Sequence, residues 1–304
     1  MMKPFLFFVL LLAALPVLAQ EEEITSGKDD LSAINVLLID GQGTHNWRET
    51  TPVLKQTLEE TGLFDVTVVT APTEWENPED FQLDFTDVDV VLLNYCGKKW
   101  SAKTCAALLQ FISNGGGLVL YHSANLTFPD WPEFQPLLGV TGWGGRTSEF
   151  GPYRYWDEDR HGVIQVNAPG PTGMMGKVDE YVIEVIAPNH PIMKGIGLKM
   201  LHGPDELYGN LRGKAENAPN VMVLASAFSS PESDGTGHKE PVLATILYGK
   251  GRVFQILYGH SSGNIRSVAF IVPFIRGTQW AATGKVTIPV PEDIPTEEKS
   301  YTRP

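Results

Sequence analysis

The chain has 304 residues, of which 42% are hydrophobic and 19% charged, and its formal net charge is −13. These fractions are typical of a globular protein and exclude collagen-like, coiled-coil and disordered chains. The acidic balance argues against nucleic acid and anionic membrane surfaces as partners, because both require clustered Lys and Arg. A neutral or cationic small molecule is left as the expected partner. The two cysteines, Cys96 and Cys105, are too few for a disulfide framework, and the sequence leaves open whether they pair.

The N-terminus has the pattern of a cleaved secretory signal, which we place at residues 1–19. A short basic start precedes an apolar run from Phe5 to Leu18, and small residues come before Gln20. The run is shorter than the roughly 20 residues that span a bilayer, so we expect no stable membrane anchor. We therefore predict a periplasmic or secreted protein, in which the acidic residues 20–33 form a disordered leader.

Short apolar runs alternate with helical segments over residues 34–121. The predicted strands are residues 34–39, 65–69, 88–95 and 118–121, and the predicted helices are residues 48–61 and 101–112. Strands that are apolar almost throughout are typical of a parallel sheet covered on both faces. This pattern predicts a doubly wound, flavodoxin-like α/β domain with a mostly parallel sheet and strand order 2-1-3-4.

The rest of the chain is less regular. We expect irregular structure at residues 131–155 and strands at residues 163–168, 181–187 and 221–227. Residues 242–248 and 252–258 predict a hairpin around Gly249-Lys250-Gly251, followed by a helix at residues 265–282. The expected organisation is one domain over residues 34–284, with an elaborated middle, a C-terminal β-hairpin plus helix, and an extended or disordered tail at residues 285–304.

Polar and aromatic residues follow the predicted strands, at the edge where open parallel sheets bind ligands. They are His45, Asn46, Trp47, Asn94, Tyr95, His122, Asn125 and His260. The phosphate-binding motifs G-x-G-x-x-G and G-x-x-x-x-G-K-[ST] are both absent from the sequence, so a nucleotide site is disfavoured. Because imidazole suits proton transfer near neutral pH, His122 and His260 are candidate catalytic residues, and the others are candidates for substrate binding.

A second polar group lies in the sequence His202-Gly-Pro-Asp205-Glu206-Leu-Tyr208. Its carboxylates, Asp205 and Glu206, are candidate catalytic residues, and Tyr208 is a candidate for substrate binding. Trp143 and Arg146 lie in a Gly-rich segment, which favours a sugar-stacking pocket wall over core packing.

Several motifs together resemble the ThuA-like (trehalose utilisation) family, within the class I glutamine amidotransferase-like fold. The resemblance spans residues 34–282 and rests on residues 37–40 leading to Thr44-His45-Asn46-Trp47, on residues 115–124, on residues 205–208, and on residues 249–254 leading to Gly259-His260.

The parent fold carries a nucleophilic Cys on the sharp turn after a strand, and His122 occupies that place here. Without the thiol, amidotransferase activity is not expected. The resemblance implies sugar chemistry on a glycoside or 3-keto-glycoside of the trehalose type. His122 or His260 would act as base, and Asp205 or Glu206 as acid or orienting group.

Three alternatives stay open at this point. One is a non-catalytic sugar-binding protein on a degenerate amidotransferase fold. Another is a metal-dependent hydrolase with Zn²⁺ or a similar divalent ion held by His45, His122, His260 and a carboxylate. A plain glycosidase is disfavoured, because the adjacent Asp205 and Glu206 make a poor pair across a scissile bond unless Glu149 or Asp157 takes part. No cofactor is certain, and the oligomeric state is open.

Overall fold

The computed structural model describes residues 32–73, 76–214 and 219–304. The predicted signal peptide and nearly all of the predicted leader lie outside the described residues. Within those ranges, no helix has the length and apolar character needed to cross a membrane.

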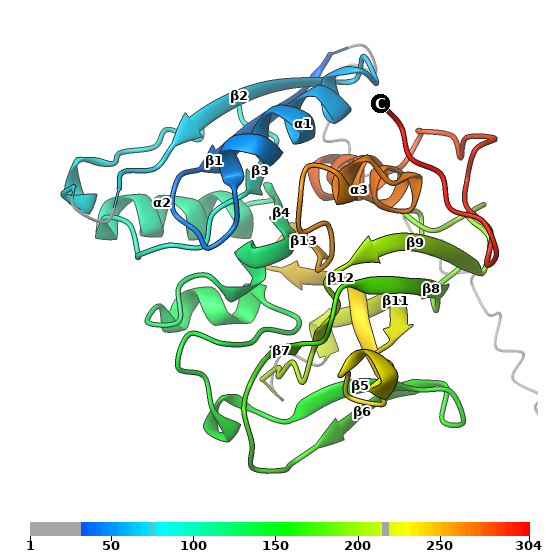
Figure 1. Ribbon diagram of the computed structural model, residues 1–304. Helices are drawn as coiled ribbons and strands as arrows, with labels where there is room; N and C mark the ends of the chain where they lie inside the picture. The colour runs from blue at the N-terminus through cyan, green and yellow to red at the C-terminus, as the bar shows by residue number, and fades with distance from the viewer. Residues whose placement is uncertain (1–31, 74–75, 215–218) are drawn as a thin grey trace, which may run out of the picture. The chain divides into compact units, whose positions relative to one another are not determined.

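The domain is built on one large sheet that has a parallel part and an antiparallel part (Figure 1). The parallel part has the order β2-β1-β3-β4-β13, which confirms the predicted order 2-1-3-4. Its strands are β1 (Ile34–Asp40), β2 (Phe64–Thr70), β3 (Val90–Leu93), β4 (Gly117–Tyr121) and β13 (Gly251–Ile256).

The antiparallel part continues the sheet beyond β13 in the order β12-β11-β8-β9. It contains β8 (Asp179–Val185), β9 (Lys199–Asp205), β11 (Val221–Phe228) and β12 (Lys239–Tyr248). At its margin β12 pairs with β5 (Tyr153–Asp157), which pairs with β6 (Gly162–Val166), while β7 (Met174–Met175) and β10 (Tyr208–Gly209) form a separate small sheet. The predicted hairpin is therefore the junction between the two parts.

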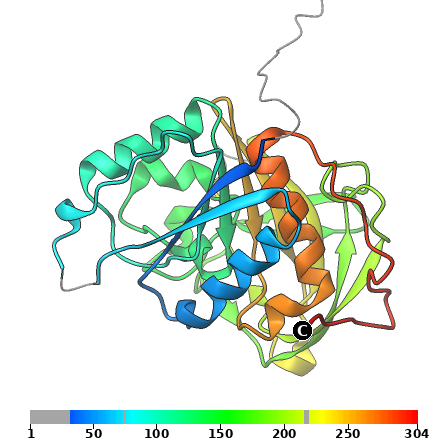
Figure 2. The ribbon, with the colours of Figure 1, turned by 90° about the horizontal axis from the view of Figure 1, so that it is seen from above.

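Helices cover both faces of the parallel part, as Figure 2 shows. Successive strand side chains point to opposite faces. Leu38 accordingly packs in the cluster that holds α1 (Trp47–Glu59) and α3 (Val268–Thr283), and the next residue, Ile39, packs in the cluster that holds α2 (Ala102–Ser113). This two-sided core explains the continuous apolar strands and confirms the doubly wound fold class.

Local sequence signals fix the bounds of α2. The Ser101 hydroxyl accepts a hydrogen bond from the Thr104 amide (3.1 Å) and caps the helix, as the sequence predicts. The helix ends before Gly115, whose φ of 124° suits glycine. Gly117 then starts β4, and a Cβ there would lie 2.6 Å from the Ala281 carbonyl oxygen of α3. Glycine at this position lets the helix lie directly on the strand.

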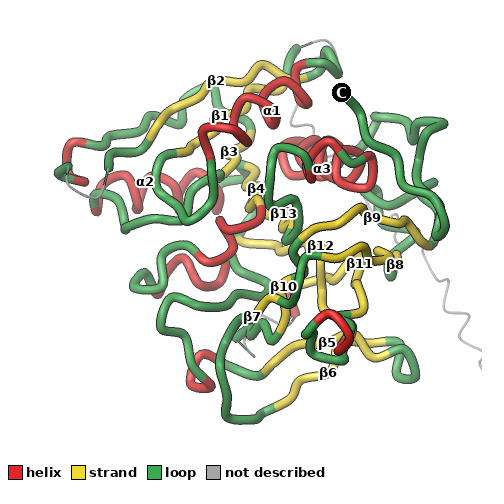
Figure 3. Tube along the Cα trace, in the orientation of Figure 1, coloured by secondary structure: helices red, strands yellow, loops and turns green. Residues whose placement is uncertain are grey.

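The middle of the chain is irregular where irregular structure is expected. Between β4 and β5 the chain forms only short helical turns and loops (Figure 3), namely η2 (His122–Leu126), η3 (Pro132–Leu137) and η4 (Ser148–Phe150). The strands expected at residues 163–168, 181–187 and 221–227 correspond to β6, β8 and β11. The sequence does not predict β9, because its Gly203-Pro204 pair obscures the strand pattern.

The tail after residue 284 contains no helix or strand in the described structure, but it packs on the domain. Ile288 is buried, and Val290 and Tyr301 pack against the same cluster as α3. The Val268 amide donates to the Tyr301 carbonyl (2.9 Å). Both cysteines are free thiols, with Cys105 buried on α2.

Candidate functional site

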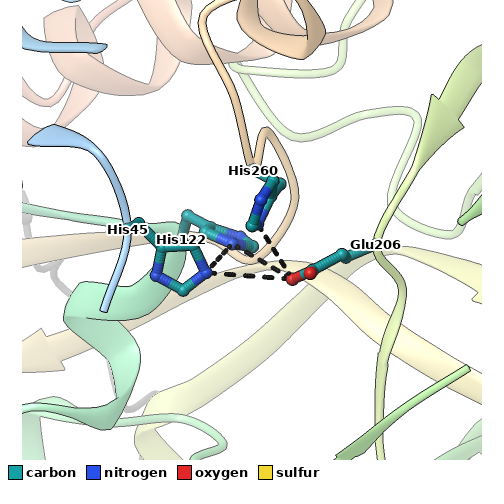
Figure 4. A group of neighbouring side chains, drawn as sticks. All are labelled: His45, His122, Glu206 and His260. Carbon is teal, nitrogen blue, oxygen red and sulfur yellow. Dashed lines mark hydrogen bonds and ion pairs between the residues drawn. The ribbon is translucent and has the colours of Figure 1, made fainter. Parts of the chain in front are cut away.

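Four side chains meet where the parallel and antiparallel parts of the sheet join (Figure 4). His45 follows β1, His122 follows β4, His260 follows β13, and Glu206 lies between β9 and β10. One nitrogen or oxygen from each residue lies within 4.8 Å of the others. We call these residues the His₃Glu cluster. They sit beyond the carboxyl ends of the parallel strands, the edge at which open α/β sheets bind ligands.

The cluster is compact and opens on one side. The Nε2 atoms of His45 and His122 are 3.2 Å apart, and His260 Nδ1 is 3.0 Å from Glu206 Oε2. Glu206 Oε2 is 3.8 Å from the Nε2 atoms of both His45 and His122. The side chain of His260 is 38% exposed and that of His122 is 1% exposed. A ligand therefore reaches the cluster past His260.

His122 occupies a strained turn directly after β4. Its φ is 43°, in the left-handed region that non-glycine residues rarely adopt. The Asn125 side-chain amide donates to the His122 carbonyl (2.7 Å) and supports the turn. Backbone strain of this kind costs about 1–3 kcal/mol and clusters at functional sites. The histidine thus stands on the sharp turn that the sequence comparison with amidotransferases predicts.

The hydrogen bonds of His122 fix its tautomer. Its Nδ1 lies 3.0 Å from the Leu257 carbonyl oxygen, which can only accept, so Nδ1 carries the proton. Nε2 then has a free lone pair, to which the Tyr208 hydroxyl donates (2.8 Å). Burial, reinforced by the neighbouring His45, lowers the pKa of His122 to about 4, so the ring is neutral at pH 7.

Asp205 lies behind the cluster and holds two of its members in place. Its Oδ1 accepts the backbone amides of Glu206 (2.9 Å) and His260 (3.2 Å), and its Oδ2 accepts the Gly259 amide (2.7 Å) and His202 Nε2 (2.9 Å). Although burial raises the pKa of Asp205, the hydrogen bond and charge of His202 outweigh it and lower the pKa. With its oxygens occupied and 1% exposure, Asp205 is a positioning residue. This corresponds to the orienting role, one of the two alternatives that the resemblance implies for these carboxylates.

Glu206 is the carboxylate that faces the imidazoles. Its Oε2 is buried and has no hydrogen-bond partner among the described residues, and the same holds for His260 Nδ1. Burial raises the pKa of Glu206, but the nearby His45 and the charges of the three histidines outweigh burial and lower the pKa. The carboxylate is therefore ionised at neutral pH.

Besides His45, which belongs to the cluster, four predicted substrate-binding residues lie next to it. The Tyr208 ring stacks on His122 with ring centroids 4.6 Å apart, and the Trp143 ring meets Tyr208 at 4.9 Å. Asn46 and Trp47 come directly after His45 at the start of α1. Asn46 is exposed, and the half-buried Trp47 ring lies 4.1 Å from the Arg48 guanidinium.

The structure does not bring Asn94, Tyr95, Asn125 or Arg146 into the cluster, because their polar atoms bond to the protein interior. Asn94 donates to the hydroxyls of two α1 threonines, and the Tyr95 hydroxyl donates to the Lys98 carbonyl. Asn125 donates to the carbonyls of His122 and Ile256, and the Arg146 guanidinium donates to three carbonyls and to a glutamine side chain. These residues shape the loops around the cluster.

Two positioning groups are missing from the sequence-based set. His202 bonds to Asp205 through Nε2 and lies 3.1 Å from the Ser267 hydroxyl through Nδ1. The close spacing of His202 and Asp205 in the sequence could have predicted that the two side chains interact. The carbonyl of Leu257 could not be predicted, because every residue has a backbone carbonyl and the sequence does not single one out.

The donor set of the cluster fits a divalent metal ion. Neutral imidazoles and a carboxylate are ligands for Zn²⁺ and similar ions. Nδ1 of His260 and Oε2 of Glu206 make no hydrogen bond in the described structure, and both are groups that a cation would satisfy.

Comparisons with known proteins agree with this architecture. Residues 35–281 match the family ThuA, described as trehalose utilisation. The chain is similar to the crystal structure of a protein from Parabacteroides merdae ATCC 43184 described as ThuA-like, with 39% identity, a TM-score of 0.85, and coverage of 90% of this chain and 98% of that one.

A more distant likeness shows the fold alone. A protein from Bacteroides uniformis ATCC 8492, also described as ThuA-like, has 14% identity and a TM-score of 0.55, over 86% of this chain and 98% of that one. A search of curated proteins finds no match. The family match over most of the chain and the 39% identical structure together show that this chain belongs to the ThuA (trehalose utilisation) family.

Proposed function

We propose that this protein is a carbohydrate-active enzyme that acts at the His₃Glu cluster on a glycoside or 3-keto-glycoside of the trehalose type. The observation that carries the proposal is the ionised, unpartnered Glu206 carboxylate facing three imidazoles beyond the carboxyl ends of the strands. Titratable groups gathered in this way suit proton transfer.

The reaction follows from the acidity of a carbon next to a carbonyl. In a 3-keto-glycoside, Glu206 takes the hydrogen from C2, and the C2–H electron pair moves toward the 3-keto oxygen. A hydrogen-bond donor or a positive charge at this oxygen stabilises the developing enolate. The enolate then forms the C1=C2 bond as the C1–O glycosidic bond breaks. The Tyr208 hydroxyl, beside the imidazoles, donates a proton to the leaving oxygen. Water then adds to the enone: its hydroxyl bonds to C1, Glu206 returns its proton to C2, and the second water proton restores the Tyr208 hydroxyl, which completes a net hydrolysis.

This assignment gives the base to a carboxylate. The Nε2 lone pair of His122 already accepts from Tyr208, and burial lowers the pKa of this ring to about 4, which makes it a weak base. Glu206 Oε2 makes no hydrogen bond in the described structure, and its nearest polar neighbour is His260 Nδ1 at 3.0 Å. The sequence-based expectation of a histidine base is therefore replaced in this proposal.

The proposal is tested by incubating the purified protein with trehalose, 3-ketotrehalose and other 3-keto-glycosides and analysing the products. We expect cleavage of at least one keto-glycoside. No product from any of them would contradict the proposed activity.

A sugar-binding protein without catalysis is the second candidate. The contact of Trp143 with Tyr208 favours it, because aromatic side chains beside polar groups line sugar sites. Calorimetric binding of a disaccharide without turnover, weakened only modestly in Glu206→Gln, would support this candidate over the enzyme.

We also propose that the protein acts in the periplasm or outside the cell, on the basis of the signal pattern in residues 1–19. Cell fractionation and N-terminal sequencing test this. We expect an exported chain that begins at or near Gln20, and an uncleaved chain confined to the cytoplasm would contradict it.

A further inference from the structure

We propose that His45, His122 and His260 form a binding site for one divalent transition-metal ion, beside which Glu206 acts as the base. The inference rests on the proposed function for the role of Glu206. The metal site itself stands on the geometry of the three imidazoles.

The distances in the cluster are those of metal ligands. Nitrogen atoms about 2.0–2.1 Å from a tetrahedral Zn²⁺ lie roughly 3.3–3.4 Å from one another. The Nε2 atoms of His45 and His122 are 3.2 Å apart, and one ligand atom of each cluster residue lies within 4.8 Å of the rest. His260, whose side chain is 38% exposed, would supply the third nitrogen.

The imidazole nitrogens that would bind an ion face the cluster. The bond from Nδ1 to the Leu257 carbonyl directs the lone pair of His122 into the cluster, as second-shell carbonyls do for metal-bound histidines. His45 Nδ1 lies 3.1 Å from the Thr44 hydroxyl, which leaves its Nε2 toward the cluster. His260 Nδ1 has no hydrogen-bond partner in the described structure.

The surrounding charge favours a cation. The Glu206 carboxyl group lies 3.0–3.8 Å from the three nitrogens. Asp205 lies directly behind, and its hydrogen bonds fix the backbone of Glu206 and His260. Three protein ligands with an open position are typical of catalytic zinc sites. A bound divalent ion would act as a Lewis acid toward the oxygen that gains charge in the reaction.

Tyr208 makes the inference sharper, because its hydroxyl donates to the lone pair that an ion would take at His122 Nε2. Metal binding must therefore release this hydroxyl, which is then free to donate to a substrate oxygen.

The test is Zn²⁺ and Mn²⁺ binding to the chelator-stripped protein, by isothermal titration calorimetry and elemental analysis. We expect one ion per chain. His45→Ala and His260→Ala should each weaken binding by more than the roughly 10–100-fold that loss of a second-shell partner costs. His238→Ala removes an exposed histidine outside the cluster and should bind like the wild type. Circular dichroism checks that each variant is folded.

Two further variants separate the parts of the inference. Tyr208→Phe should bind Zn²⁺ at least as tightly as the wild type, because a competitor is removed. Weaker binding would identify the phenol as a ligand and overturn the three-imidazole assignment. Glu206→Gln should still bind one ion but lose turnover.

The inference is overturned if the wild type takes up no stoichiometric ion, or if His45→Ala and His238→Ala bind alike. Its failure is distinguishable from failure of the proposed function. Turnover by the metal-free protein would contradict a role for the metal in the reaction and support the proposed function. Stoichiometric metal binding with no turnover of any keto-glycoside would support the metal site and contradict the proposed function.

Discussion

The parallel and antiparallel parts of the sheet contribute differently to the site. The parallel part supplies the three imidazoles, each from the loop that follows a strand: His45 after β1, His122 after β4 and His260 after β13. The antiparallel part supplies Glu206 and Tyr208 from the segment after β9. The parallel part alone would therefore form a ligand-binding edge with three histidines but without the proposed base. The antiparallel strands add that base, Glu206.

The largest expected effect lies in the parallel part. His122→Asn should lower kcat by about 10²–10⁴-fold, because it removes the ring that orients the Tyr208 hydroxyl, the proposed proton donor. Asparagine tolerates the left-handed backbone at this position better than alanine. Steady-state kinetics on a cleaved keto-glycoside measure the effect, and thermal unfolding controls for the fold. A variant with wild-type kcat would show that the parallel part does not contribute to the reaction.

The next effect concerns the link between the two parts. Asp205→Ala removes the buried carboxylate that joins His202, Glu206 and the β13 loop. A buried donor left without its acceptor costs roughly 1–3 kcal/mol in the free energy of unfolding, and Asp205→Ala leaves several such donors. Urea denaturation measures this cost.

Asp293→Ala is the matched control, because it breaks the half-exposed pair with Arg303 and should cost about 1 kcal/mol or less. Equal costs for the two variants would mean that Asp205 does not hold the two parts together.

A smaller, pH-dependent effect belongs to the antiparallel part. Glu240 on β12 is buried, and burial outweighs its hydrogen bonds from the Asn210 amide and the Thr236 hydroxyl, raising its pKa to about 8. Between pH 4.5 and 8 the folded state keeps a proton that the unfolded state has released. The contribution of Glu240 to stability therefore falls as the pH rises through this window.

Glu240→Gln lacks this titration. Its stability relative to the wild type should increase with pH by up to about 1.4 kcal/mol per unit, measured by urea denaturation across the window. Parallel stability curves for the two proteins would contradict the raised pKa.

The sequence predicts the parallel part better than the antiparallel part, for a physical reason. Strands buried on both faces carry continuous apolar runs, so β1, β3 and β4 and the histidine loops after β1 and β4 can be located from the sequence. The edge strand β9 has no such run and is held by pairing with β8 and by a bond from the Leu201 amide to the Thr296 carbonyl in the tail.

The candidate site follows the same rule. The convergence of the three histidines follows from the parallel topology and can be predicted. The roles of the adjacent Asp205 and Glu206 cannot, because neighbouring residues in an extended segment point in opposite directions. One faces the β13 loop and the other the imidazoles. Arg146 in a Gly-rich loop suggests a ligand contact, yet its guanidinium satisfies loop carbonyls.

The central claim is that a base from the antiparallel part works against imidazoles from the parallel part. It is tested most directly by following the C2 hydrogen of 3-ketotrehalose by NMR in D₂O with the wild type and with Glu206→Gln. The account predicts that the wild type removes the C2 hydrogen and cleaves the glycosidic bond, whereas Glu206→Gln is slower by about 100-fold or more. Equal rates for the two proteins, or an intact C2 hydrogen with both, would contradict it.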